Sequence, residues 1–264
     1  MALPHGFRCV LLGLMRGSSI DVCGCFPTGR HYPGIADLLA LTLDQVEGLW
    51  PDFAAQSPWI DLPWAVIDFE TTGFDDQVDR VVEVGVVCFR GGEVTARINH
   101  LINPGMPIPE SAISVHGITD AMVENAPRFE LIAEELRGAL HGHLPIAYNA
   151  TFDRKFMHTE MTRAGVLTDL PPALDARVTW ADPLVWVREL MSEEKSKRLG
   201  DICEKLGIPL NDAHRAWADA EATGKVLIAL QERMPRSYGE LIRIQDQYAA
   251  RQEAELSDWR RRRS

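Results

Sequence analysis

Two carboxylates, two residues apart, are the first groups in this sequence that point to chemistry. Asp68 and Glu70 lie at the end of the short apolar run 65–69, and a turn containing Gly73 follows. Residues two apart in a strand point to the same face, so the two carboxylates emerge side by side. Like charges on one face of a buried strand repel each other and are costly to desolvate. Either this strand end is solvated, or a divalent cation lies between the two acids.

Three further polar residues occur in contexts that favour the same place. Asp153 lies in the first turn of a helix that is predicted directly after an apolar strand. Asp219 lies near the start of the last long helix, five residues after His214. Each alone fits a plain role, an acid at a helix N-terminus or a histidine in a loop. Because functional side chains of open α/β sheets gather at strand carboxyl ends and adjacent helix starts, we expect these residues to converge.

The pattern along the chain predicts a mixed sheet flanked by helices. Three strands joined by short connections come first, and strands alternating with helices follow. The predicted strands cover residues 65–69, 81–89, 94–102, 144–149 and 173–179. The predicted helices cover residues 129–141, 149–164, 182–191, 199–206 and 216–231. We therefore expect an α/β fold with a five-stranded mixed sheet and a small helical N-terminal extension.

The sequence divides into three parts by composition. Residues 1–62 form an extension of unknown function, with apolar positions at helical spacing over 35–50. We expect aromatic residues near its end to pack onto the main domain, and binding of a protein partner is the alternative; these residues are Trp50, Phe53 and Trp59. Residues 63–233 form the main domain. Residues 234–264 form a charged helix with a basic tail, which is either solvated or in contact with nucleic-acid phosphates.

Composition excludes several classes of protein. The 264 residues are 46% hydrophobic and 25% charged, as in ordinary soluble proteins, and no apolar run approaches the ~20 residues of a membrane span. The apolar segment 9–15 after Arg8 resembles a weak signal peptide without a clear cleavage site, so we expect a cytoplasmic protein. A net charge of -11 argues against tight binding along a nucleic-acid duplex.

The five cysteines are scattered, which makes a disulfide framework a poor interpretation. A zinc site near the N-terminus is the alternative, but the spacing of its candidate ligands fits no standard pattern. These candidates are Cys9, Cys23, Cys25 and His31.

Four short motifs follow one another between residues 64 and 230. They are Asp68-x-Glu70-Thr71-Thr72-Gly73, Val115-His116-Gly117-Ile118, Asn149-x-x-Phe152-Asp153 and His214-x-x-x-x-Asp219. This ordered set resembles the DnaQ-like 3′–5′ exonucleases of the DEDDh type, a family with the proofreading subunit of bacterial DNA polymerase III and ribonuclease T among its members. The resemblance implies a ribonuclease H-like fold and metal-dependent release of nucleoside 5′-monophosphates from a nucleic-acid 3′ end.

The resemblance also implies a role for each motif residue. Two divalent cations, Mg²⁺ or Mn²⁺, would be held with Asp68 between them, Glu70 and Asp219 completing one site and Asp153 holding the other. His214 would be the general base. The terminal nucleotide would be bound by the remaining motif residues, which are Thr71, Thr72, Gly73, His116, Ile118, Asn149 and Phe152. At Gly73 the backbone would approach the nucleotide closely.

Two departures and two alternatives stay open. Trp217 stands where the family often has a smaller residue, and no clamp-binding Gln-x-x-Leu-Phe peptide occurs in the tail, which weakens the case for a proofreading subunit. We expect single-stranded or frayed DNA as substrate, with RNA as the other choice. A catalytically silent nucleic-acid-binding or protein-interaction module on the same fold is one alternative, and a small-molecule phosphatase on a related fold is the other.

Overall fold

The computed structural model describes residues 46–166, 168–210 and 213–262. Three expectations for the N-terminal extension lie outside these residues: the zinc site, the signal-like segment and most of the helix over 35–50. The described end of that helix, residues 46–50, contains a turn and no helix.

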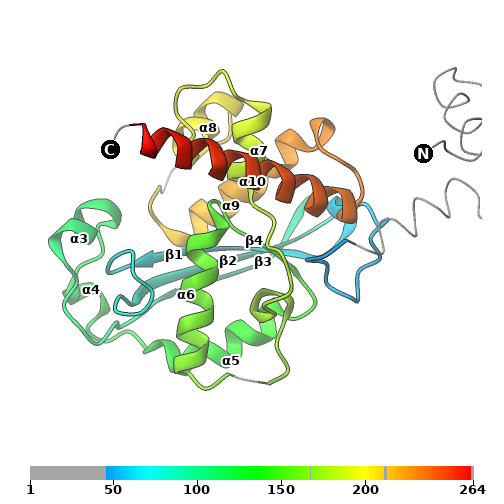
Figure 1. Ribbon diagram of the computed structural model, residues 1–264. Coiled ribbons are helices and arrows are strands. Elements are labelled where there is room, and N and C mark those ends of the chain that lie inside the picture. Colours follow the sequence, from blue (N-terminus) through cyan, green and yellow to red (C-terminus); the bar gives the residue numbers. More distant parts are fainter. Residues whose placement is uncertain (1–45, 167, 211–212, 263–264) are drawn as a thin grey trace, which may run out of the picture. The chain divides into compact units, whose positions relative to one another are not determined.

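The described residues form one four-stranded sheet, in the order β3-β2-β1-β4 (Figure 1). The strands are β1 (Trp64–Thr71), β2 (Val81–Arg90), β3 (Glu93–Leu101) and β4 (Leu144–Ile146). β1, β2 and β3 run antiparallel, and β4 runs parallel to β1. Gly91 and Gly92 connect β2 to β3 with positive φ angles of 58° and 81°, as a two-residue hairpin turn requires. β1 pairs with β2 along one edge and, over its first three residues, with β4 along the other edge.

The prediction of a fifth strand over 173–179 is wrong. That segment holds a short 3-10 helix, Pro172–Leu174, and a turn. The chain reaches the edge of β4 only at Ala181, which makes an isolated parallel bridge to Ile146. Pro183, two residues later, has no N–H for a sheet ladder and instead begins the next helix. The contact with β4 is therefore one residue long.

Eight α-helices surround the sheet in the described part of the chain. They are α3 (Glu110–His116), α4 (Asp120–Val123), α5 (Phe129–Leu140), α6 (Ala150–Arg163), α7 (Pro183–Leu190), α8 (Leu199–Leu206), α9 (Ala216–Leu230) and α10 (Tyr238–Arg261). α3 occupies a segment for which the sequence predicted no helix, and it ends at Gly117 in the left-handed conformation. Short 3-10 helices also occur at Trp59–Asp61 and Gln231–Arg233.

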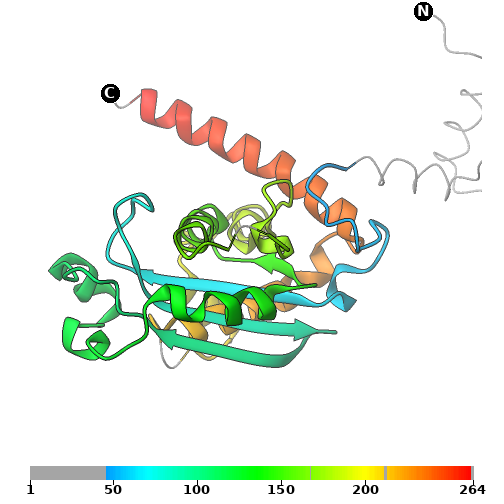
Figure 2. The same ribbon diagram turned by 90° about the horizontal axis from the view of Figure 1, so that it is seen from below.

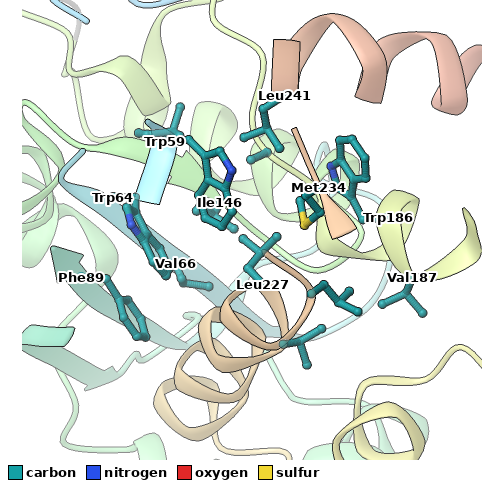
Figure 3. Close-up of a cluster of buried hydrophobic side chains, with 14 of the residues drawn as sticks. Trp59, Trp64, Val66, Phe89, Ile146, Trp186, Val187, Leu227, Met234 and Leu241 are labelled. Carbon is teal, nitrogen blue, oxygen red and sulfur yellow. The ribbon is translucent and has the colours of Figure 1, made fainter. Parts of the chain in front are cut away.

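Alternate residues of β1 belong to two hydrophobic cores. Trp64 and Val66 pack with side chains of α7, α9 and α10 on one face of the sheet (Figure 3). Ile67 and Phe69 pack with α5 and α6 on the other face. Figure 2 shows the strands from below, with α10, in red-orange, running above them in the view. The period of two along a strand then places Asp68 on the face that α9 covers.

The segment before β1 packs onto the main domain, as expected for its aromatic residues. Trp59 is buried, and its indole N–H donates to the Pro235 carbonyl at 2.9 Å. The ring of Phe53 meets that of Tyr238 edge-on, and the Trp50 N–H donates to the Tyr238 hydroxyl at 3.0 Å. Residues 50–62 and α10 therefore share one packed unit with the sheet, while the functional boundaries at residues 62 and 233 stay predictions.

None of the helices in the described ranges has both the length and the apolar character that crossing a membrane demands.

Gly85 in β2 gives a test of how α9 meets the sheet. A Cβ atom at Gly85 would lie less than 3.0 Å from backbone atoms of Ala216 and Trp217, so the first turn of α9 rests directly on this strand. We expect Gly85→Ala to lower the free energy of unfolding by about 1–3 kcal/mol through overpacking, measured by urea denaturation. Gly138→Ala is the control, because open space surrounds Gly138 in α5 and alanine favours a helix. Equal stability of the two variants would contradict the close contact.

Candidate active site

The far end of β1 carries the centre of the site. Glu70 lies opposite Glu83 of β2 in the strand register, and Asp68 lies opposite Gly85. Burial raises the pKa of Asp68 well above its ordinary range, and the charges of Asp153 and other nearby acids raise it further. Burial, followed by the charge of Asp219, raises the pKa of Glu70 to about 8. Both shifts show that several carboxylates crowd one partly buried space.

Asp153 reaches this space along the open edge of β1. β4 ends at Ile146, opposite Val66, so the later N–H groups of β1 have no strand partner on that edge. The Phe69 N–H instead donates to Asp153 Oδ1 at 3.1 Å. Asp153 is buried, which raises the pKa of its carboxyl group despite this hydrogen bond. The short β4 therefore leaves room for a carboxylate from α6 beside β1.

Asp182 fixes the start of α6. Its carboxylate accepts the N–H groups of Asn149 and Ala150, both at 3.0 Å, and that of Leu184 at 2.9 Å. Asn149 takes the left-handed conformation with φ 69°, and its side chain is exposed. Asp182 thus caps α7 and holds the backbone that presents Asp153.

His214 and Asp219 come from the start of α9. The His214 N–H donates to Asp219 Oδ2 at 3.0 Å, and His214 has φ 65°, which is uncommon for a residue other than glycine. Burial raises the pKa of Asp219, and this hydrogen bond lowers it in part. Ligand atoms of Glu70, His214 and Asp219 all lie within 4.8 Å of one another. The structure thus brings all five candidate catalytic residues to one end of β1.

The chemistry of these groups fits a divalent cation. Carboxylate oxygens are the donors that Mg²⁺ and Mn²⁺ prefer. The charges of Asp153 and Asp219 raise the pKa of both Asp68 and Glu70, so these groups repel one another in the protein without metal. The charge of Arg215 lowers the pKa of Glu70 in part, and a bound cation would relieve the remaining repulsion.

The turn after β1 is held by its own hydrogen bonds. Thr71 Oγ1 donates to the Gly73 carbonyl at 2.6 Å, and Thr72 Oγ1 donates to Asp79 Oδ1 at 3.0 Å. A Cβ atom at Gly73 would overlap the Asp79 carboxylate, so packing against Asp79 already requires a glycine there. Only the backbone of this turn is left to face a ligand.

His116 and Ile118 occupy different environments. His116 is buried, its Nδ1 accepts the Ile118 N–H at 3.0 Å, and burial lowers its pKa. A hydrogen bond with the Thr71 backbone raises this pKa in part, so the imidazole lies against the end of β1. Ile118 is completely buried with Val82 and Val123, so its side chain packs in a small core and does not line a surface pocket.

An exposed aromatic side chain lies beside the acidic cluster. Phe74, directly after the turn, is 90% exposed, and its ring centroid lies 6.3 Å from that of Phe152. Phe152 in turn packs on Phe156, with ring centroids 4.9 Å apart. Sequence reasoning missed Phe74, although an aromatic residue directly after a turn of site residues was a usable signal.

Comparisons with known proteins agree with this geometry. A family model described as exonuclease matches residues 65–227. The chain is 34% identical over 167 residues to a PolC-type DNA polymerase III of Bacillus cereus, covering 63% of this chain and 11% of that protein. It is 31% identical over 197 residues to the PolC-type enzyme of Thermotoga maritima, covering 75% of this chain and 14% of that protein. The chain therefore spans only a small part of these curated relatives.

Solved structures share the fold. Exonuclease X in complex with 5′-overhanging duplex DNA superposes with a TM-score of 0.53 at 23% identity, covering 69% of this chain and 99% of that one. E. coli exonuclease I in complex with a dT13 oligonucleotide superposes with a TM-score of 0.58 at 19% identity, covering 66% and 42%.

The crowded acids predict an unusual dependence of stability on pH. Between pH 4.5 and about 8 the folded protein keeps a proton on Glu70 that the unfolded chain has released. Without metal, the free energy of unfolding should therefore fall as the pH rises through this window. Mn²⁺ should raise the melting temperature more at about pH 8 than at about pH 6, because protons compete with it.

Thermal unfolding in EDTA and in Mn²⁺ measures both effects. Glu70→Gln is the control and should flatten the pH profile in EDTA. Equal stabilisation by Mn²⁺ at both pH values would contradict a metal site built on these acids.

Proposed function

The chain belongs to the exonuclease family, and we propose that it is a metal-dependent 3′–5′ exonuclease of the DEDDh type that releases nucleoside 5′-monophosphates. One observation carries this proposal: four acids from three separate elements meet at the end of β1, with an exposed histidine beside them. A fold that did no chemistry would gain nothing from packing like charges in this way.

The acids have distinct places in the proposed site. Asp68, Glu70, Asp153 and Asp219 would hold two divalent cations, which when bound neutralise charge on the phosphate and on the departing oxygen. Asp68 has the central place, because the charges of the other three acids all raise its pKa. The hydrogen bond from the Phe69 N–H uses one oxygen of Asp153, and the other oxygen would bind the cation.

His214 is the proposed general base. A water molecule attacks the phosphorus of the terminal nucleotide, and its proton moves to a ring nitrogen of His214. The bond from this phosphorus to the 3′ oxygen of the preceding nucleotide breaks, and that oxygen takes up a proton from solvent. An imidazole suits this task near neutral pH. The His214 side chain is exposed, so water reaches it, and the bond to Asp219 holds its backbone next to the acids.

We further propose that the substrate is the 3′ end of single-stranded or frayed DNA. The backbone of 71–73, the exposed side chain of Asn149 and the rings of Phe152 and Phe74 border the cluster. Aromatic rings accept any base by stacking, which suits an enzyme that acts on an end without reading sequence. The comparison structures of exonucleases I and X hold DNA, which favours DNA over RNA.

Two other expectations remain proposals: residues 63–233 would carry the activity, and the protein would act in the cytoplasm. Binding of a protein partner through residues 1–62 stays the alternative role for that extension. His116 would border the nucleotide pocket, whereas the burial of Ile118 favours packing as its role.

The polarity and the metal ligands are tested together. We expect Asp68→Asn and Asp219→Asn to lower the rate at least about 10²-fold, because each removes charge that stabilises the reaction. The measurement is degradation of a 5′-labelled single strand in Mg²⁺ or Mn²⁺, where shortening from the 3′ end gives a ladder. Asp52→Asn, an exposed acid outside the cluster, is the control. Products that shorten from the 5′ end would refute the proposed polarity.

The role of His214 is tested separately from metal binding. We expect His214→Gln to lower kcat by about 10²–10⁴-fold, as loss of a general base does. The apparent affinity for Mn²⁺, from a titration of activity and of melting temperature, should stay close to that of the wild type. Parallel losses of kcat and of Mn²⁺ affinity would instead make His214 a metal ligand.

A further inference from the structure

Glu83 is a buried carboxylate that the proposed reaction does not use. It lies near the start of β2, opposite Glu70, and its side chain has no exposed surface. Its charge raises the pKa of Asp68 and of Glu70, so its presence makes the crowding at the site worse. A buried acid beside four others needs a compensating contact to persist.

Two groups at the start of α9 provide that compensation. The Arg215 guanidinium lies 2.8 Å from Glu83 Oε1, and the Ala216 N–H donates to Glu83 Oε2 at 3.2 Å. Oε1 has no well-aligned hydrogen bond, so the charge of Arg215 is what balances it. Both carboxylate oxygens are thus committed to one short segment of chain.

That segment presents two proposed active-site residues. Arg215 directly follows His214, and Ala216 is the first residue of α9, three before Asp219. Arg215 is the N-cap residue of α9 but offers no side-chain cap of its own. Glu83 satisfies one of the unpaired N–H groups of the helix start from a neighbouring strand. The bond between His214 and Asp219 then closes the turn on its other side.

A second ion pair ties the same helix to the sheet farther from the site. Arg97 of β3 lies 2.6 Å from Glu221 of α9. It joins the same two layers as Glu83 and Arg215 do, but it does not contact the His214 turn. Loss of the Arg97–Glu221 pair therefore tests attachment of α9 to the sheet, whereas loss of the Glu83–Arg215 pair also tests the position of the His214 turn.

We propose that Glu83 is a positioning residue that sets the place of His214 and Asp219 through Arg215 and the Ala216 N–H. This inference rests on the proposed function. Its physical basis is that a displacement of about 1 Å at a catalytic group costs about 10²-fold in rate. The close contact between Gly85 of β2 and the backbone of Ala216 and Trp217 also fixes the first turn of α9 against the sheet.

The test compares Arg215→Gln, Glu83→Gln and the double variant with the control Arg97→Gln. We expect Arg215→Gln to lower kcat at least about 10-fold while KM changes less than about 3-fold, since the lost placement acts on the chemical step. Arg97→Gln should leave kcat within about 2-fold of the wild type. The double variant should lose no more kcat than the more impaired single variant, because both single substitutions remove the same interaction between Glu83 and Arg215. Arg215→Lys, which keeps the charge, should recover part of the loss.

Amide hydrogen exchange over residues 213–219 gives a readout that does not depend on catalysis. Arg215→Gln should speed exchange in this peptide, and Arg97→Gln should not. If the wild type degrades no strand, the proposed function fails, but the exchange result still tests whether Glu83 and Arg215 hold the start of α9 in place. If the wild type is active and Arg215→Gln matches Arg97→Gln in both kcat and exchange, the inference is overturned. If Arg215→Gln does not fold, Glu83→Gln takes its place, and kcat and exchange equal to those of Arg97→Gln are then the contradicting result.

Discussion

The rest of the structure depends on the mutual repulsion of carboxylates at the end of β1. Asp68, Glu70, Asp153 and Asp219 share one partly buried space, and the charges of Asp153 and Asp219 raise the pKa of Asp68 and of Glu70. Such a cluster opposes folding unless rigid elements hold it and a cation neutralises it. The two hydrophobic cores on either side of β1 supply the rigid part, because they fix the strand from both faces.

Two further acids, the partly buried Asp182 and the buried Glu83, serve the site without belonging to the cluster of proposed ligands. Asp182 accepts N–H groups at the start of α6, and Glu83 accepts one at the start of α9. Negative charge at a helix N-terminus is favourable, which offsets part of the cost of burying these carboxylates. The helices that carry Asp153 and Asp219 therefore begin at fixed points, and their side chains meet β1 in one place.

Local patterns in the sequence predicted much of the fold. The β-branched run of β2, the Gly91-Gly92 turn and the helix end at Gly207 each follow from local backbone preferences. The segment 173–179 has the composition of a strand. The chain nevertheless makes only one bridge to β4, at Ala181, because α7 begins two residues later at Pro183. α3 was missed because its seven residues are too few to show a helical period beside the prolines that precede it.

The sequence by itself determined which side chains can do chemistry, because the types and spacing of Asp68, Glu70, Asp153, His214 and Asp219 are local properties of three of the four motifs. Only the tertiary structure decided how they are held. In the sequence, Glu83 is one acid in a valine-rich strand. The strand register places it opposite Glu70, and the tertiary fold brings Arg215 into contact with it. Likewise, Ile118 looks like a ligand contact in the sequence, but its side chain packs in a small core. Contacts between residues far apart in the chain arise from packing, which no local pattern records.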